Sequence, residues 1–154
     1  MYNKENMICS FCVNEYHLAV IIIPYIYNAM NEKKKIITFF DRGIRDISMK
    51  VINTNELFWK NKNVFSDIDW DKVKFEKLAQ KFENVQDNDI VIVAGKDDFI
   101  ERINRLLINF HTNFTLVNCY NVKDIAKNDN FKISNYGKLL NTKGLVEIEN
   151  INFV

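Results

Sequence analysis

Residues Met7 to Met30 read MICSFCVNEYHLAVIIIPYIYNAM and are too hydrophobic to lie anywhere but at the centre of a folded domain. Met7 to Val13 is apolar almost throughout, which is typical of an interior strand in a parallel sheet. Asn14 can cap a following helix, and Glu15 to Met30 has the length of one. We therefore expect a buried strand followed by a helix that is kinked near Pro24, the chain's only proline.

The expected helix is apolar nearly all round from Leu18 to Tyr27. Val20 to Ile23 is β-branched and could form a strand, but a helix is favoured because one set of residues recurs at helical spacing, namely Tyr16, Val20, Ile23, Tyr27 and Met30. The outer side must be covered either by another layer of this chain or by another chain. A homodimer or a complex formed through this helix is therefore one alternative.

Length and composition indicate a single α/β domain over residues 1–154. A chain of 154 residues with 47% hydrophobic residues is large enough to bury one core. Its 21 basic and 20 acidic residues nearly cancel, so no basic surface for nucleic acid is expected. The longest apolar run is about half of a bilayer span. Three cysteines and no signal-peptide pattern favour a cytoplasmic protein.

Strands and helices alternate along the rest of the chain. The expected strands are Lys35 to Phe40, Asn63 to Ile68, Asp89 to Gly95 and Phe114 to Tyr120, with a terminal edge strand at Leu145 to Ile148. The expected helices run from Ile44 to Asn53, from Trp70 to Phe82, from a capping box at Asp98 to Phe110, and from Ser134 to Leu140. This alternation predicts a three-layer α/β/α sandwich with a mainly parallel sheet of about five strands, Rossmann-like or flavodoxin-like.

Four glycines bear on the question of nucleotide binding. Neither G-x-x-x-x-G-K-[ST] nor G-x-G-x-x-G is present, although both motifs need glycines where backbone approaches phosphate. Gly95 and Lys96 follow a strand, but Asp97 and Asp98 place negative charge where an anion would lie. The sequence therefore predicts no P-loop, no dinucleotide site and no cofactor.

Cys9 and Cys12 form a C-x-x-C pair within the first expected strand. Because their side chains would lie on opposite faces, we expect two buried structural cysteines instead of a redox pair. A zinc site made of Cys9, Cys12, Cys119 and His17 has the right number of ligands and is an alternative.

Carboxylates supply a second alternative. Asp67 and Asp69 follow one expected strand, and Asp97 and Asp98 follow another. If the two groups met at one sheet edge, they could hold Mg²⁺ for hydrolysis or phosphoryl transfer. Capping of loops and helices is the competing interpretation.

The most informative positions follow the strand ends. Ligands of open parallel sheets bind outside the carboxyl ends of the strands, where the strand order reverses. The polar side chains expected there are Asn14, Glu15, His17, Asp41, Arg42, Arg45, Lys96, Asp97 and Asn118. Two arginines and a lysine in this set suit a small anionic or nucleotide-like ligand.

The first forty residues also resemble a known family. Ile8, Cys9 and Phe11, then Asn14-Glu15, Leu18, Pro24-Tyr25 and the strand opening at Lys35 resemble the start of MEDS-type sensory domains, found in regulators of methanogens and methylotrophs. Met7 stands where that family usually has His, and its later Gly-rich strand motif is not found in residues 90–154. The resemblance implies a ligand-sensing α/β domain without its output module. From the sequence as a whole, we expect a non-enzymatic, cytoplasmic α/β domain that binds a small ligand or a protein partner and regulates another process.

Overall fold

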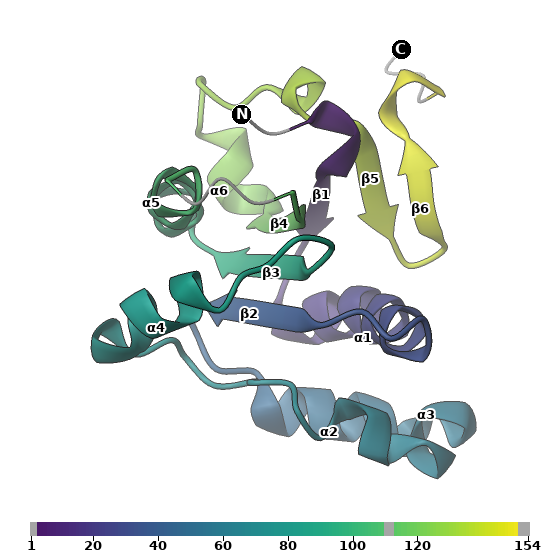
Figure 1. Ribbon diagram of the computed structural model, residues 1–154. Coiled ribbons are helices and arrows are strands. Elements are labelled where there is room, and N and C mark those ends of the chain that lie inside the picture. Colours follow the sequence, from purple (N-terminus) through teal and green to yellow (C-terminus); the bar gives the residue numbers. More distant parts are fainter. Residues whose placement is uncertain (1–2, 110–112, 151–154) are drawn as a thin grey trace.

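A computed structural model of the chain describes residues 3–109 and 113–150. Six strands form one sheet in the order β2-β3-β4-β1-β5-β6 (Figure 1). They are β1 (Met7–Cys12), β2 (Ile36–Phe40), β3 (Ile90–Gly95), β4 (Thr115–Asn121), β5 (Lys138–Asn141) and β6 (Gly144–Glu147). All neighbours are parallel except β5 and β6, which form an antiparallel hairpin. The mainly parallel α/β sheet is confirmed, with six strands where a sheet of about five was expected.

Helices cover both faces of this sheet. The helices are α1 (Glu15–Asn31), α2 (Arg45–Thr54), α3 (Glu56–Lys60), α4 (Leu78–Glu83), α5 (Asp97–Leu107) and α6 (Val122–Ala126). Short 3-10 turns are η1 (Lys4–Asn6), η2 (Lys62–Phe65), η3 (Phe75–Lys77), η4 (Ile133–Asn135) and η5 (Ile148–Asn150). Figure 1 shows α1 on one side of the strands and α5 with α6 on the other. No helix in the described part of the chain has the length and hydrophobicity needed to cross a membrane.

Two hydrophobic cores flank the sheet. The first core is formed by side chains of α1, of α2 and of the turns that follow α2 in the chain. The second core is formed by side chains of α4 and α5. Cys12 contributes to the first core and Cys9 to the second. Successive side chains of a strand point to opposite faces, so two residues that are three apart lie on different faces. Their predicted placement as two separate buried cysteines is confirmed.

Helix α1 forms as expected and packs most of its side chains into the core on its side of the sheet. Its fully buried side chains are Leu18, Ala19, Ile21, Ile22, Ile23, Ile26 and Ala29, whereas Tyr16 is 57% exposed. The outer side is covered by this chain itself. Tyr27 packs on Phe58 of α3 and Phe65 of η2, at ring centroid distances of 5.3 and 6.2 Å. Residues 18–27 therefore present no exposed apolar side chain to a second chain.

The segment from Asn63 to Ile68 is not a strand. Its backbone closes successive turns, with Ser66 N–H donating to Asn63 and Ile68 N–H donating to Phe65. Phe65 and Ile68 therefore lie three residues apart on one side and are both buried in the α1 core. A spacing of three fits a turn and not the two-residue period of a strand.

The helix expected from Trp70 to Phe82 begins only at Leu78. Residues 70–73 are extended beside β2, where Ile44 N–H donates to Trp70 O and Val73 N–H donates to Phe40 O. Trp70 is 1% exposed and stacks on Phe40. Burial of this indole in the α1 core holds the segment against the edge of the sheet.

Two other expected helices also differ from the elements that the structure shows. Helix α5 begins after Lys96, so Asp97 and Asp98 lie in its first turn, where their carboxylates accept hydrogen bonds from the N–H groups of Asp98 and Phe99, and the N-cap residue Lys96 makes no side-chain cap. The residues expected to form a helix from Ser134 to Leu140 form η4 and then β5, which pairs with β1. Along α5, Ile100, Ile103 and Leu107 are buried and Leu106 is 38% exposed, while Phe110, the expected end of this helix, lies outside the described residues.

The order of the strands defines a switch point. From β1 the chain crosses by α1 towards β2, and from the neighbouring strand β4 it crosses by α6 towards β5. Connections that leave adjacent strands in opposite directions open a crevice at their carboxyl ends, which is where open α/β sheets bind ligands.

Candidate functional site

A cavity of about 250 Å³ lies at the carboxyl ends of β1, β2, β3 and β4. We call it the strand-end cavity. Its apolar wall contains Cys12, Leu18, Phe40, Ile44, Ala94 and Cys119, and its polar rim contains Asn14, Glu15, Asp41, Arg42, Lys96, Asn121, Lys123 and Asp124, with Gly95 between them. The cavity therefore lies at the predicted edge of the sheet.

Five of the nine predicted site residues line this cavity, namely Asn14, Glu15, Asp41, Arg42 and Lys96. They meet because the parallel strands all end at one edge. The connection from β1 to α1 is only Val13 and Asn14, so the first turn of α1 starts directly at the cavity. Asn14 caps that helix by accepting a hydrogen bond from His17 N–H at 2.8 Å.

The other four predicted residues have different surroundings. His17 accepts a hydrogen bond from Val13 N–H through Nδ1, at 3.1 Å, and so stabilises the β1 to α1 turn. Asn118 is fully buried on the opposite face, where its Nδ2 donates to the hydroxyl of Tyr136. Asp97 accepts hydrogen bonds from Asp98 N–H and from Asn128 Nδ2 on the α5 side. None of these three side chains lines the strand-end cavity.

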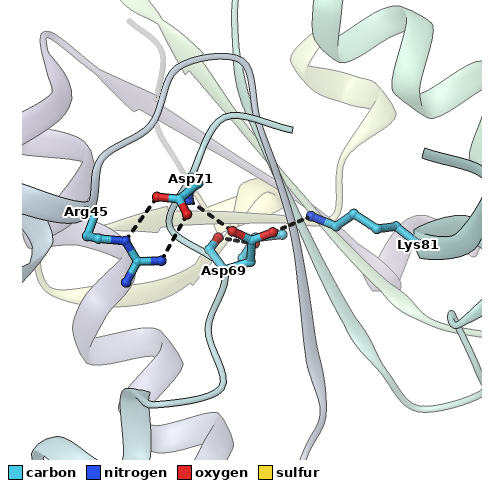
Figure 2. Close-up of polar contacts among 5 residues, drawn as sticks. Arg45, Asp69, Asp71 and Lys81 are labelled. Atoms are coloured by element: carbon cyan, nitrogen blue, oxygen red, sulfur yellow. Dashed lines mark hydrogen bonds and ion pairs between the residues drawn. The ribbon is translucent and has the colours of Figure 1, made fainter. Parts of the chain in front are cut away.

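Arg45, the fourth, forms a two-pronged contact with Asp71. Its Nε and Nη2 donate to the two carboxylate oxygens at 3.0 and 3.1 Å (Figure 2). This pairing raises the pKa of Arg45 and lowers the pKa of Asp71, because the side-chain hydrogen bonds favour both charged forms. The guanidinium is thus engaged away from the cavity.

Three further polar residues complete the rim. Asn121, Lys123 and Asp124 come from the end of β4 and the first turn of α6. Asn121 caps α6 by accepting a hydrogen bond from Lys123 N–H at 2.9 Å. The sequence signal is the Asn-x-x-Asp spacing after a buried strand, which marks a helix start even where the helix has only five residues.

Charges of both signs surround the cavity. Arg42 Nη1 donates to Glu15 Oε1 at 2.8 Å, which joins the end of β2 to α1. Asp41 accepts a long hydrogen bond of 3.4 Å from Lys96 N–H. The side chains of Lys96 and Lys123 form no ion pair within the described residues. These two ammonium groups are therefore open to a bound anion.

Gly95, the last residue of β3, allows the end of β3 to come close to the end of β2. A Cβ at this position would collide with the side chain of Asp41 and lie 2.9 Å from the ring of Phe99. A side chain at residue 95 would push Asp41 out of the rim. The glycine is thus required by close packing at the cavity.

Two thiols in the cavity wall are held in their neutral form. Burial raises the pKa of Cys12 to about 11, with the nearby carboxylates of Glu15 and Asp124 adding to the effect. Burial also raises the pKa of Cys119 well above its usual range. Because the thiolate is the reactive form, neither cysteine is poised as a nucleophile.

The magnesium alternative depended on Asp67 and Asp69. Asp69 accepts a hydrogen bond from Asp71 N–H at 3.1 Å and pairs with Lys81 at 3.3 Å, as Figure 2 shows. Asp67 is exposed. Within residues 3–109 and 113–150, no three histidine, cysteine or acidic side chains come close enough together to hold a metal ion. The geometry therefore favours neither the aspartate site nor the proposed zinc set.

Comparisons with protein-family models, with curated proteins and with solved structures found no match to this chain.

Proposed function

We propose that this chain is a cytoplasmic ligand-binding or sensory domain that takes a small anion in the strand-end cavity. The observation that carries the proposal is the pair of ammonium groups of Lys96 and Lys123 on the rim of a cavity with an apolar wall. Such a wall excludes water from part of a ligand, while charged groups at the rim orient it. The resemblance to a sensory domain at the N-terminal end of the chain agrees with this role.

The size and backbone of the site indicate which anion fits. A volume of about 250 Å³ lies just below the range of roughly 300–1,000 Å³ typical of drug-sized ligands. The two-residue connection from β1 to α1 has no loop with which to surround a chain of phosphates. The first N–H groups of α5 are occupied by Asp97 and Asp98. A small carboxylate or a single phosphate group therefore fits better than a whole nucleotide.

A binding role is favoured over catalysis. The thiol of Cys12 is protonated and donates to the carbonyl of Tyr120, and the Nδ1 of His17 is engaged by the backbone. The described lining thus presents neither an activated nucleophile nor a histidine base, which acid–base and covalent catalysis commonly use.

The test compares affinities for inorganic phosphate and propanoate, measured by titration calorimetry. Lys96→Gln and Lys123→Gln are each expected to weaken binding roughly tenfold, the loss typical of a hydrogen bond to a charged group. Lys143→Gln in the β5 to β6 turn and Arg45→Gln remove a positive charge outside the cavity and should leave the affinity unchanged. Equal losses in all four variants would show nonspecific attraction and contradict the proposal.

A further inference from the structure

The rim of the strand-end cavity carries equal numbers of positive and negative side chains. Its cations are Arg42, Lys96 and Lys123, and its carboxylates are Glu15, Asp41 and Asp124. The formal charges of the rim therefore cancel. A ligand with negative charge alone leaves such a rim unbalanced, whereas binding sites match the charges of their ligands in sign and position.

The two signs of charge lie at different depths. All three carboxylates are half-buried, whereas the three cations are exposed. A carboxylate that is partly withdrawn from water loses part of its hydration, so it is stabilised by a cation beside it. The inner part of the rim therefore favours a positive group of a ligand, and the outer part favours a negative group.

Two of the carboxylates have no cation partner among the described residues. Glu15 is neutralised by Arg42, whose Nη1 donates to it at 2.8 Å. Asp41 accepts a hydrogen bond of 3.4 Å from the backbone N–H of Lys96, a group without formal charge. Neither Asp41 nor Asp124 forms an ion pair within residues 3–109 and 113–150. These two half-buried negative charges are open to a cation of a ligand.

The negative charge also acts on the apolar wall. Burial, and then the carboxylates of Glu15 and Asp124, raise the pKa of Cys12 to about 11. The Cys12 thiol supplies no compensating charge, because it stays protonated and donates to the carbonyl of Tyr120 at 3.5 Å. A positive group held between the wall and the rim therefore meets negative charge that the protein leaves uncompensated.

The apolar wall indicates the rest of the ligand. Five of its side chains are at most 6% exposed, namely Leu18, Phe40, Ile44, Ala94 and Cys119. The cavity volume of about 250 Å³ lies just below that of drug-sized sites, so it suits a short aliphatic chain. An aliphatic group, a cation and an anion are thus needed within one small molecule.

We propose that the strand-end cavity binds a small zwitterion, namely an aliphatic α-amino acid. Its side chain lies against the apolar wall. Its ammonium group faces Asp41 and Asp124, and its carboxylate faces the two lysines of the rim. This inference rests on the proposed function, because the carboxylate of the amino acid is the small anion of that proposal. It adds the ammonium group and the two aspartates that recognise it.

The test uses L-valine as the probe, with two matched compounds that each lack one charge. 3-Methylbutanoate keeps the carbon skeleton and the carboxylate but has no ammonium group. 2-Methylpropan-1-amine keeps the side chain and the ammonium group but has no carboxylate. Titration calorimetry at neutral pH should show that valine binds roughly tenfold more tightly than either compound, the effect of one lost hydrogen bond to a charged group.

Asp41→Asn and Asp124→Asn test the contact with the ammonium group. Each substitution keeps the size of the side chain and removes its charge, so it should weaken valine binding roughly tenfold. Binding of 3-methylbutanoate should stay equal or become stronger, which also shows that the variant is folded. Asp67→Asn removes an exposed carboxylate outside the cavity and should change neither affinity.

The outcomes separate this inference from the proposed function. If 3-methylbutanoate binds as tightly as valine and its binding depends on Lys96 and Lys123, the anion site is supported and the amino acid is wrong. If the amine binds as tightly as valine, the site takes a cation and both proposals are wrong. If neither valine nor 3-methylbutanoate binds, both are wrong as well. Valine binding that Asp41→Asn and Asp124→Asn leave unchanged would overturn this inference alone.

Discussion

Arg42 and Glu15 are joined by an ion pair of 2.8 Å between the end of β2 and the first turn of α1. Both residues line the strand-end cavity, and the arginine side chain is 78% exposed. The pair therefore neutralises one cation of the rim and leaves Lys96 and Lys123 as the cations without a partner.

Removing the carboxylate of this pair should strengthen anion binding. Glu15→Gln releases the Arg42 guanidinium and removes a negative charge from the rim, so we expect propanoate affinity to rise roughly three- to tenfold. Because exposed ion pairs contribute about 0–1 kcal/mol, the free energy of unfolding should change little. Calorimetry and urea unfolding measure the two effects, and weaker binding by the variant would argue against an anion at this rim.

Adding a methyl group at Gly95 should destabilise the fold. Gly95→Ala places a Cβ against Asp41 and Phe99, which we expect to lower the free energy of unfolding by about 1–3 kcal/mol. Gly144→Ala is the matched variant, because its φ is +114° but no atom lies within 4 Å of the added Cβ. Urea unfolding should show the larger loss at Gly95, together with weaker anion binding. A loss at Gly95 well below about 1 kcal/mol would contradict crowding at this position.

The buried thiols predict a loss of stability in alkali. Burial raises the pKa of Cys9 to about 12 and that of Cys12 to about 11, from an ordinary value of 9.0. Above pH 9.0 the unfolded chain releases these protons while the folded chain keeps them. The free energy of unfolding should therefore fall as the pH rises towards 11, by up to about 1.4 kcal/mol per pH unit for each thiol.

Urea unfolding over this pH range checks the effect. Cys9→Ala should show a shallower decline than the wild type, because one of the protons is absent in both states. In the native protein the thiols should also resist iodoacetamide until urea unfolds the chain. Alkylation of the folded protein at the rate of free cysteine would contradict the burial that raises these pKa values.

Shortening a buried side chain of α1 should lower the free energy of unfolding, and the urea midpoint should not depend on protein concentration. Ile22 is fully buried in the core, so Ile22→Ala is expected to cost about 2–5 kcal/mol. If α1 packs only within its own chain, the urea midpoints of wild type and variant will not shift with concentration. A midpoint that rises with concentration would instead support the alternative of a dimer formed through this helix.

The features that the sequence predicts best are those that depend on a local pattern of apolar and polar residues. The apolar runs of β1, β2, β3 and β4 identify the parallel strands, and the end of each strand then places Asn14, Glu15, Asp41, Arg42 and Lys96 at one edge. No knowledge of the strand order is needed, because all parallel strands end on the same side.

Long-range contacts account for what the sequence does not reveal. Arg45 lies three residues after Arg42 but starts α2, where it meets Asp71 from a distant segment. Lys138–Asn141 pairs with β1 and forms β5, although its leucines also fit a helix. Lys123 was missed because a helix of five residues gives too short a periodic pattern to detect.

The most direct measurement is a ¹⁵N-resolved titration of the wild-type chain and of the double variant Lys96→Gln, Lys123→Gln with propanoate. The proposed function predicts saturable amide shifts in the wild type at Gly95, Lys96 and Lys123, and their loss in the double variant. Shifts that never saturate, that lie away from the carboxyl ends of β1 to β4, or that persist unchanged in the double variant would contradict an anion site at this edge of the sheet.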